Sequence, residues 1–109
     1  MAHFQDEEAY RLLEPQVQIA VTGLTPNRFS TKAVIEAVLS IPEGTEAYGA
    51  ALALLKDQGA TDHTARLVVH GQVVPGLLRR CGLVRFAGFV HGDPAQDDGY
   101  AVPSWWQRL

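Results

Sequence analysis

The spacing of apolar side chains predicts helices over most of the first two thirds of the chain. Residues 5–15 begin with acidic side chains, which favour the positive end of a helix dipole, and Pro15 is expected to end this short helix. Residues 17–24 alternate apolar and polar positions at first and then reach Gly23, which predicts a short strand.

Two further helices are expected in the middle of the chain. Residues 30–41 predict the clearest one, because Ser30 can cap it and Pro42 can end it. The second should run from Thr45 to about Gln58, with the following glycine as a left-handed stop. The residues expected on the two buried faces are Val34, Ile35, Val38, Leu39, Tyr48, Ala51, Leu52 and Leu55.

A third helix should begin after Thr61, which can cap it. Its continuation has two interpretations, because residues 66–74 could also form two short β-branched strands around a turn at His70 and Gly71. We favour a helix to about His70, a break near Gly71 and a further helical piece that starts at Pro75.

The last third of the chain predicts a β-hairpin. Residues 83–92 and 100–106 form its arms, and residues 93–99 are rich in turn formers and acidic side chains. The expected fold is therefore an α+β domain, with three to four helices followed by a C-terminal β-hairpin. Residues 1–15 should pack as a helix on a single domain formed by residues 16–109.

Composition and charge narrow the class of protein. The chain has 109 residues and is 47% hydrophobic, which fits one globular domain. The formal net charge is -3, but acidic residues dominate both ends, 1–15 and 93–109, while residues 16–92 carry a small basic excess. This distribution permits nucleic-acid binding without requiring it.

The order of helices and hairpin within residues 30–104 resembles a winged-helix domain. Residues 52–69 resemble a helix-turn-helix, with Gly59 in the turn, and in that motif the second helix enters the major groove. The resemblance implies a module that binds double-stranded DNA and could act as a dimeric regulator. The groove-facing candidates are His63, Thr64, Arg66 and His70, and the candidates for phosphate contacts are Arg79, Arg80 and Arg85.

An alternative is an interaction or assembly module, a homodimer or a partner of another protein, on the same fold and without nucleic acid. Tyr10 and Leu13 form an apolar stripe that could either dock on the domain or meet a partner. Trp105 and Trp106 are adjacent, so one can complete the core while the other is left for an interface.

Catalysis and metal binding find little support in the sequence. Cys81 is the single cysteine and has no identifiable base beside it, so we expect no enzyme and no cofactor. His63 and His70 are two helical turns apart, too far to hold one metal ion. The start of the chain lacks the pattern of a signal peptide, and no apolar run is long enough to span a membrane, so a cytoplasmic location is expected.

Overall fold

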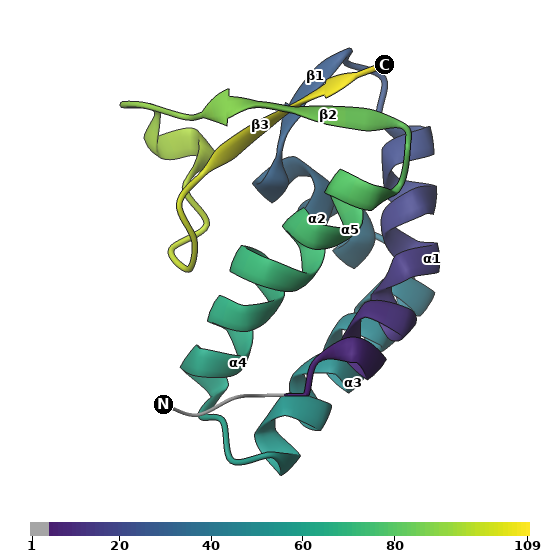
Figure 1. Cartoon of the computed structure of the whole chain (residues 1–109), viewed down its shortest axis with the longest axis vertical. Coiled ribbons are helices and arrows are strands. Elements are labelled where there is room, and N and C mark those ends of the chain that lie inside the picture. The colour runs from purple at the N-terminus through teal and green to yellow at the C-terminus, as the bar shows by residue number, and fades with distance from the viewer. Residues whose placement is uncertain (1–4) are drawn as a thin grey trace.

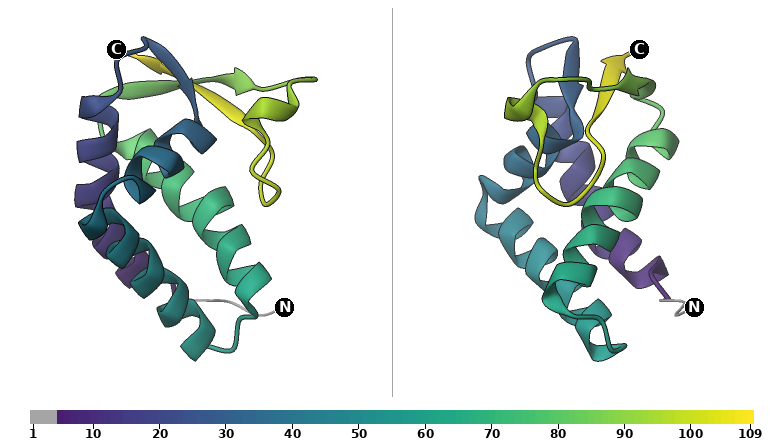
Figure 2. Two further views of the ribbon diagram at one scale, coloured as in Figure 1. Left: turned by 180° about the vertical axis from the view of Figure 1, so that it is seen from behind. Right: turned by 90° about the vertical axis from the view of Figure 1, so that its left-hand side faces the viewer.

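The computed structural model describes residues 5–109, and these form helices with a small antiparallel sheet across one end (Figure 1). In chain order the elements are α1 (Glu7–Gly23), β1 (Arg28–Ser30), α2 (Thr31–Leu39), α3 (Pro42–Asp57), α4 (Asp62–Val68), a π-helical segment (Val69–Val73), α5 (Val74–Arg80), β2 (Val84–Phe89), a short 3-10 helix (Pro94–Gln96) and β3 (Ser104–Arg108). The expected α+β architecture is confirmed at this level. The helices α1 and α3 lie side by side, and α4, the π-helical segment and α5 form one continuous rod beside them (Figure 2).

Helix α1 is longer than the sequence pattern suggested. Pro15 lies inside it, so the predictions of a helix end at Pro15 and of a strand over residues 17–24 are both wrong. The loss of one backbone hydrogen bond is tolerated because Pro15 and Arg11 are exposed, which leaves the freed Arg11 carbonyl accessible to water. The boundary expected between residues 15 and 16 falls within this helix. Its buried residues follow one helical stripe across the proline: Ala9, Leu13, Val17, Ala20 and Val21.

The two middle helices follow the prediction except at their junction and at Leu39, which was expected to be buried and is 39% exposed at the end of α2. The Ser30 hydroxyl accepts a hydrogen bond from the Ala33 N–H, so the predicted cap of α2 is confirmed. Pro42 does not end α2 but occupies the first turn of α3, where its missing N–H costs nothing. The predicted stop after α3 is confirmed by the positive φ of Gly59, +101°.

The rod from Asp62 to Arg80 contains no strand, which rules out the interpretation of residues 66–74 as a hairpin. Thr61 caps its start by accepting from the Thr64 N–H, as predicted. The predicted break at Gly71 is wrong, because the chain stays helical there through a π-helical turn in which the Val74 N–H donates to the Val69 carbonyl. This wider turn keeps the ring of Pro75 from crowding the carbonyl four residues earlier.

The sheet has the strand order β1-β3-β2, and both pairings are antiparallel. The hairpin of β2 and β3 is confirmed, although its connection spans residues 90–103 and is longer than expected. Strand β1 was not predicted, because Arg28–Ser30 is only three residues long and follows a turn. It pairs with β3 so that Phe29 lies opposite Trp106.

Trp106 completes the core beneath the sheet, with 0% of its surface exposed. Its indole Nε1 donates to the Thr31 hydroxyl over 2.8 Å, and that hydroxyl lies 2.7 Å from the Ser104 hydroxyl. These buried hydrogen bonds tie β3 to the start of α2 and satisfy polar groups that would otherwise destabilise the core. Trp105 points to the other side, partly exposed, with the Arg28 guanidinium 5.0 Å above its ring. The expectation that one tryptophan completes the core is therefore confirmed.

Candidate nucleic-acid interface

Three exposed arginines lie close together in the sequence where α5 leads into β2. Arg79 and Arg80 lie in the last turn of α5, and Arg85 follows in β2. We call Arg79, Arg80 and Arg85 the arginine cluster. Within residues 5–109 none of the three has a carboxylate partner within ion-pair distance.

Aromatic rings support two members of the arginine cluster. The Arg79 guanidinium lies 5.7 Å from the Trp106 ring and 5.9 Å from the Phe86 ring. The Arg80 guanidinium lies 4.4 Å from the ring of Tyr10 on α1. A guanidinium that stacks on a ring keeps its N–H groups free at the edge, where they can bind an anion in a bidentate manner.

The lysines and arginines that form ion pairs with carboxylates all lie outside the arginine cluster. The pairs are Arg11 with Glu8, Lys32 with Glu36, and Lys56 and Arg66 with Asp62. Hydrogen bonds from Arg66 and Lys56 lower the pKa of Asp62 to about 2, so this carboxylate is charged at neutral pH, pairs with both cations and cancels one of their two charges. Among residues 5–109, the arginines without an ion pair thus lie in α5 and the sheet, and one of them, Arg80, borders a hollow that Asp6, Glu7 and Glu14 also line.

The outer face of the sheet continues the basic surface. The strand register places Arg28 opposite Gln107 and Gln107 opposite Arg85, which makes one polar row across three strands. Since neighbouring strands lie about 4.8 Å apart, the two arginines are anchored about 10 Å from each other. Sequence reasoning missed Arg28 and Gln107, because β1 was not predicted and no local pattern reveals which residues lie opposite one another.

The residues predicted to face a DNA groove lie in α4 and in the π-helical segment, not in the arginine cluster. The Thr64 hydroxyl accepts from the Thr61 hydroxyl, and Arg66 is held by the ion pair described above. His63 is exposed, whereas His70 is buried, with 5% of its surface accessible. His63 and His70 lie on one side of the rod, because the ring of Tyr100 packs against both. Their role in binding stays a prediction.

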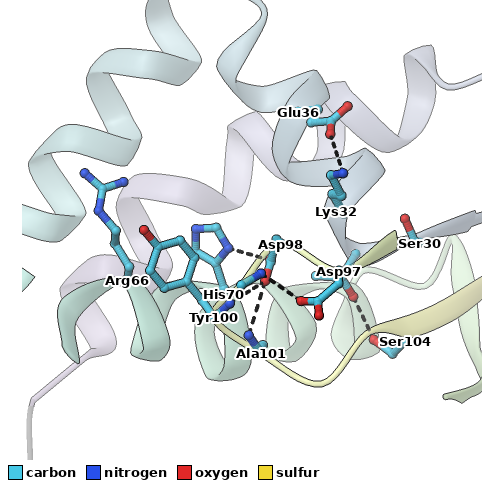
Figure 3. Close-up of polar contacts among 12 residues, drawn as sticks. Ser30, Lys32, Glu36, Arg66, His70, Asp97, Asp98, Tyr100, Ala101 and Ser104 are labelled. Atoms are coloured by element: carbon cyan, nitrogen blue, oxygen red, sulfur yellow. Dashed lines mark hydrogen bonds and ion pairs between the residues drawn. The ribbon is translucent and has the colours of Figure 1, made fainter. Parts of the chain in front are cut away.

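His70 is the centre of a series of hydrogen-bonded groups that sequence reasoning did not find, and Figure 3 shows its contact with Asp98. Its Nδ1 lies 2.6 Å from the Asp98 carboxylate, and its Nε2 lies 2.6 Å from the Tyr48 hydroxyl. The Arg66 guanidinium donates to that hydroxyl over 3.1 Å, so the Tyr48 proton is available to His70 Nε2 and the ring proton on Nδ1 goes to Asp98. Both ring nitrogens are therefore occupied, which leaves none free as a base or a metal ligand.

The pKa values of Tyr48 and Asp98, the two groups that flank His70, are shifted from their ordinary values. Burial raises the pKa of the Tyr48 hydroxyl against the opposing effect of Arg66. Burial alone would raise the pKa of Asp98 as well. Hydrogen bonds from His70 and from the backbone N–H groups of Tyr100 and Ala101 outweigh it and hold that pKa below its ordinary value of 3.8.

We expect the Asp98 contact to stabilise the fold at neutral pH and to fail in acid. Because the pKa of Asp98 is lower in the folded state, its contribution is complete above pH 3.8 and is lost as the pH falls through the folded-state value. Thermal unfolding of wild type and Asp98→Asn between pH 7 and pH 2 measures this. The wild type should be more stable at pH 7, and the difference should shrink below pH 3.8. A difference that stays constant over the whole range would contradict this assignment.

The residues predicted for a partner interface are mostly engaged within the domain. Leu13 is 1% exposed and packs in the core, and the buried Trp106 is equally inaccessible. The half-buried Tyr10 donates its hydroxyl proton to the Gln72 carbonyl over 3.1 Å. The apolar stripe therefore docks on the domain, and an interface at Tyr10 or Trp105 stays a prediction.

Within the part of the chain that the structure describes, no three histidine, cysteine or acidic side chains gather to hold a metal ion. The helices described are also too short or too polar to cross a membrane.

Comparison of the sequence with models of protein families, with curated proteins and with solved structures finds no match. The class that the coordinates define is thus a small α+β domain in which helices support a three-stranded antiparallel sheet.

Proposed function

We propose that the domain binds double-stranded DNA through the arginine cluster, with Arg28 as a further contact on the outer face of the sheet. The order of elements, a long helical rod that leads directly into a β-hairpin, supports a winged-helix-like arrangement. The observation that carries the proposal is that ion-paired and unpaired basic residues lie in different parts of the fold. The ion-paired bases lie elsewhere, while Arg79, Arg80 and Arg85 are exposed and have no carboxylate partner among residues 5–109.

Phosphate recognition explains why such arginines would stay unpaired. A guanidinium that is already bound to a carboxylate must break that pair before it can neutralise a phosphate, whereas an unpaired one need not. Contacts of this kind give affinity without base specificity. We therefore expect this surface to bind duplexes of different sequence with similar strength.

The double variant R80Q/R85Q tests the proposal. Loss of two phosphate contacts should weaken binding to a labelled random duplex at low salt by about tenfold or more, as followed by fluorescence anisotropy. The matched control is R11Q/K56Q, which removes the same charge from two ion-paired positions. The control should bind within about twofold of wild type.

Two results would contradict the proposal. One is equal weakening by both double variants, because it would show only a response to net charge. The other is wild-type affinity in R80Q/R85Q, because it would place the contacts elsewhere.

A further inference from the structure

Residues 97–101, which belong to the long connection between β2 and β3, lie across the rod at α4 and the π-helical segment (Figure 3). The Asp98 carboxylate binds Nδ1 of His70, and the ring of Tyr100 packs at 4.9 Å from His70 and 5.6 Å from His63, measured between ring centroids. This segment therefore covers the side of the rod that the sequence predicted to face DNA.

Residues 97–101 are held to the rod by side chains alone. Within residues 5–109, the backbone of residues 98–102 makes no hydrogen bond to the backbone of another segment. The Asp98 carboxylate also accepts from the N–H groups of Tyr100 and Ala101, which keeps the turn together rather than fixing it to the rod. Gly99, with φ of +82°, gives the turn a conformation that other residues adopt only with strain. The segment can thus be released by breaking the contacts of two side chains, Asp98 and Tyr100.

The covered side of the rod is continuous with the arginine cluster. His70 and Arg79 border the same hollow of about 230 Å³, which Tyr100 and Ala101 border from the opposite side. Along a helical rod these two residues are separated by about 14 Å, at 1.5 Å per residue. One duplex can therefore reach both once the segment moves away.

Residues 97–101 present negative charge to the rod, as the phosphates of the proposed DNA ligand would. Asp98 presents a carboxylate to His70 Nδ1, the same donor that a phosphate or a base edge would use. Asp97 is exposed beside it and adds a second negative charge above the rod. The π-helical turn that carries His70 is also a local geometry found frequently at functional sites.

We propose that residues 97–101 form an intramolecular latch that competes with DNA for a second contact surface on the rod, made by His63 and His70. This inference rests on the proposed function, because the arginine cluster supplies the first contact. In the closed state only the arginine cluster binds. Opening of the latch adds the rod to the interface and raises affinity.

The double variant D98N/Y100A opens the latch in the full chain. It removes the charge that binds His70 and the ring that packs on both histidines, while the remaining amide oxygen can still accept the turn's N–H groups. If the latch is closed in about nine tenths of wild-type molecules, opening it should raise the affinity for a random duplex by up to about tenfold, the limit being set by how weakly the closed state binds. The control D93N removes an equal charge from the same connection, outside residues 97–101, where the carboxylate accepts only from the Ala95 N–H, and it should change affinity by less than about twofold.

Hydrogen exchange reports the latch without DNA, so the two proposals can fail separately. Amides of residues 99–101 should exchange faster in D98N/Y100A, and adding His63→Ala to this variant should remove part of the gain in affinity. Faster exchange with no gain in affinity would overturn the latch while leaving the arginine cluster in place. Absence of binding by the wild type and by the open variant would overturn both. D98N alone, expected to show a smaller gain of the same sign, replaces the double variant if the latter fails to fold.

Discussion

Replacing Trp106 with alanine is expected to destabilise the domain by about 3–5 kcal/mol, since a fully buried aromatic side chain leaves a large cavity. The substitution also removes the donor to the Thr31 hydroxyl, which couples β3 to α2. This loss is a large part of the stability of a typical domain. Urea unfolding followed by circular dichroism measures it.

The neighbouring residue provides the control for Trp106. Trp105 has the same side chain on the outer face of the sheet, partly exposed beneath Arg28. We expect Trp105→Ala to cost less than Trp106→Ala, about 1–2 kcal/mol, because it loses a cation–π contact and a smaller buried area. Equal losses for the two substitutions would show that the strand register is wrong.

Gly44→Ala is expected to have the second largest effect on stability. Gly44 lies in the first turn of α3 against the end of α2, and an added Cβ would lie 1.9 Å from the Val38 carbonyl oxygen. Backbone cannot move aside as a flexible side chain can, so α2 and α3 must separate. Such overpacking costs about 1–3 kcal/mol and sometimes more.

The same helix offers a control of opposite sign. Gly49 is exposed within α3, and an added Cβ there would meet nothing within 4 Å. Gly49→Ala should therefore stabilise the domain by about 0.5–1 kcal/mol through the reduced backbone entropy of the unfolded chain. Thermal unfolding of both variants compares the two effects directly. A neutral Gly44→Ala would mean that the helices do not approach as closely as described.

Local signals in the sequence predicted the parts of the fold that depend on near neighbours. Ser30 and Thr61 cap helices because their side chains reach an N–H three residues later, and Gly59 ends α3 because it adopts a positive φ. These interactions need no knowledge of the tertiary structure. The hairpin was predicted for the same reason, since turn formers separate two apolar segments.

Long-range packing decided the parts that sequence reasoning missed. Pro15 would end an isolated helix, but the buried stripe of α1 continues past it and outweighs the lost hydrogen bond. Strand β1 exists because β3 offers it a partner almost 80 residues later, with Arg28 opposite Gln107. Short strands of this kind carry no distinctive pattern of their own.

The part of the candidate site that is close together in the sequence was predicted, and the part that depends on long-range packing was not. Arg79, Arg80 and Arg85 were visible because they are clustered in the sequence, and the structure leaves them exposed. Asp98 lies 28 residues from His70 and 50 from Tyr48, so no spacing rule could link them. A histidine on a polar helix face looks accessible until the loop that covers it is known.

The salt dependence of duplex binding tests the central claim most directly. Wild-type affinity for a labelled random duplex should be measured by fluorescence anisotropy from low to physiological salt. Because each neutralised phosphate contributes about -0.9 to the slope of log K against log salt, the arginine cluster predicts a slope of about -3, to which Arg28 adds about -1. R80Q/R85Q should reduce its magnitude by about 2, and R11Q/K56Q should leave it unchanged. No binding at low salt, or binding with a slope near zero, would contradict DNA recognition by the arginine cluster.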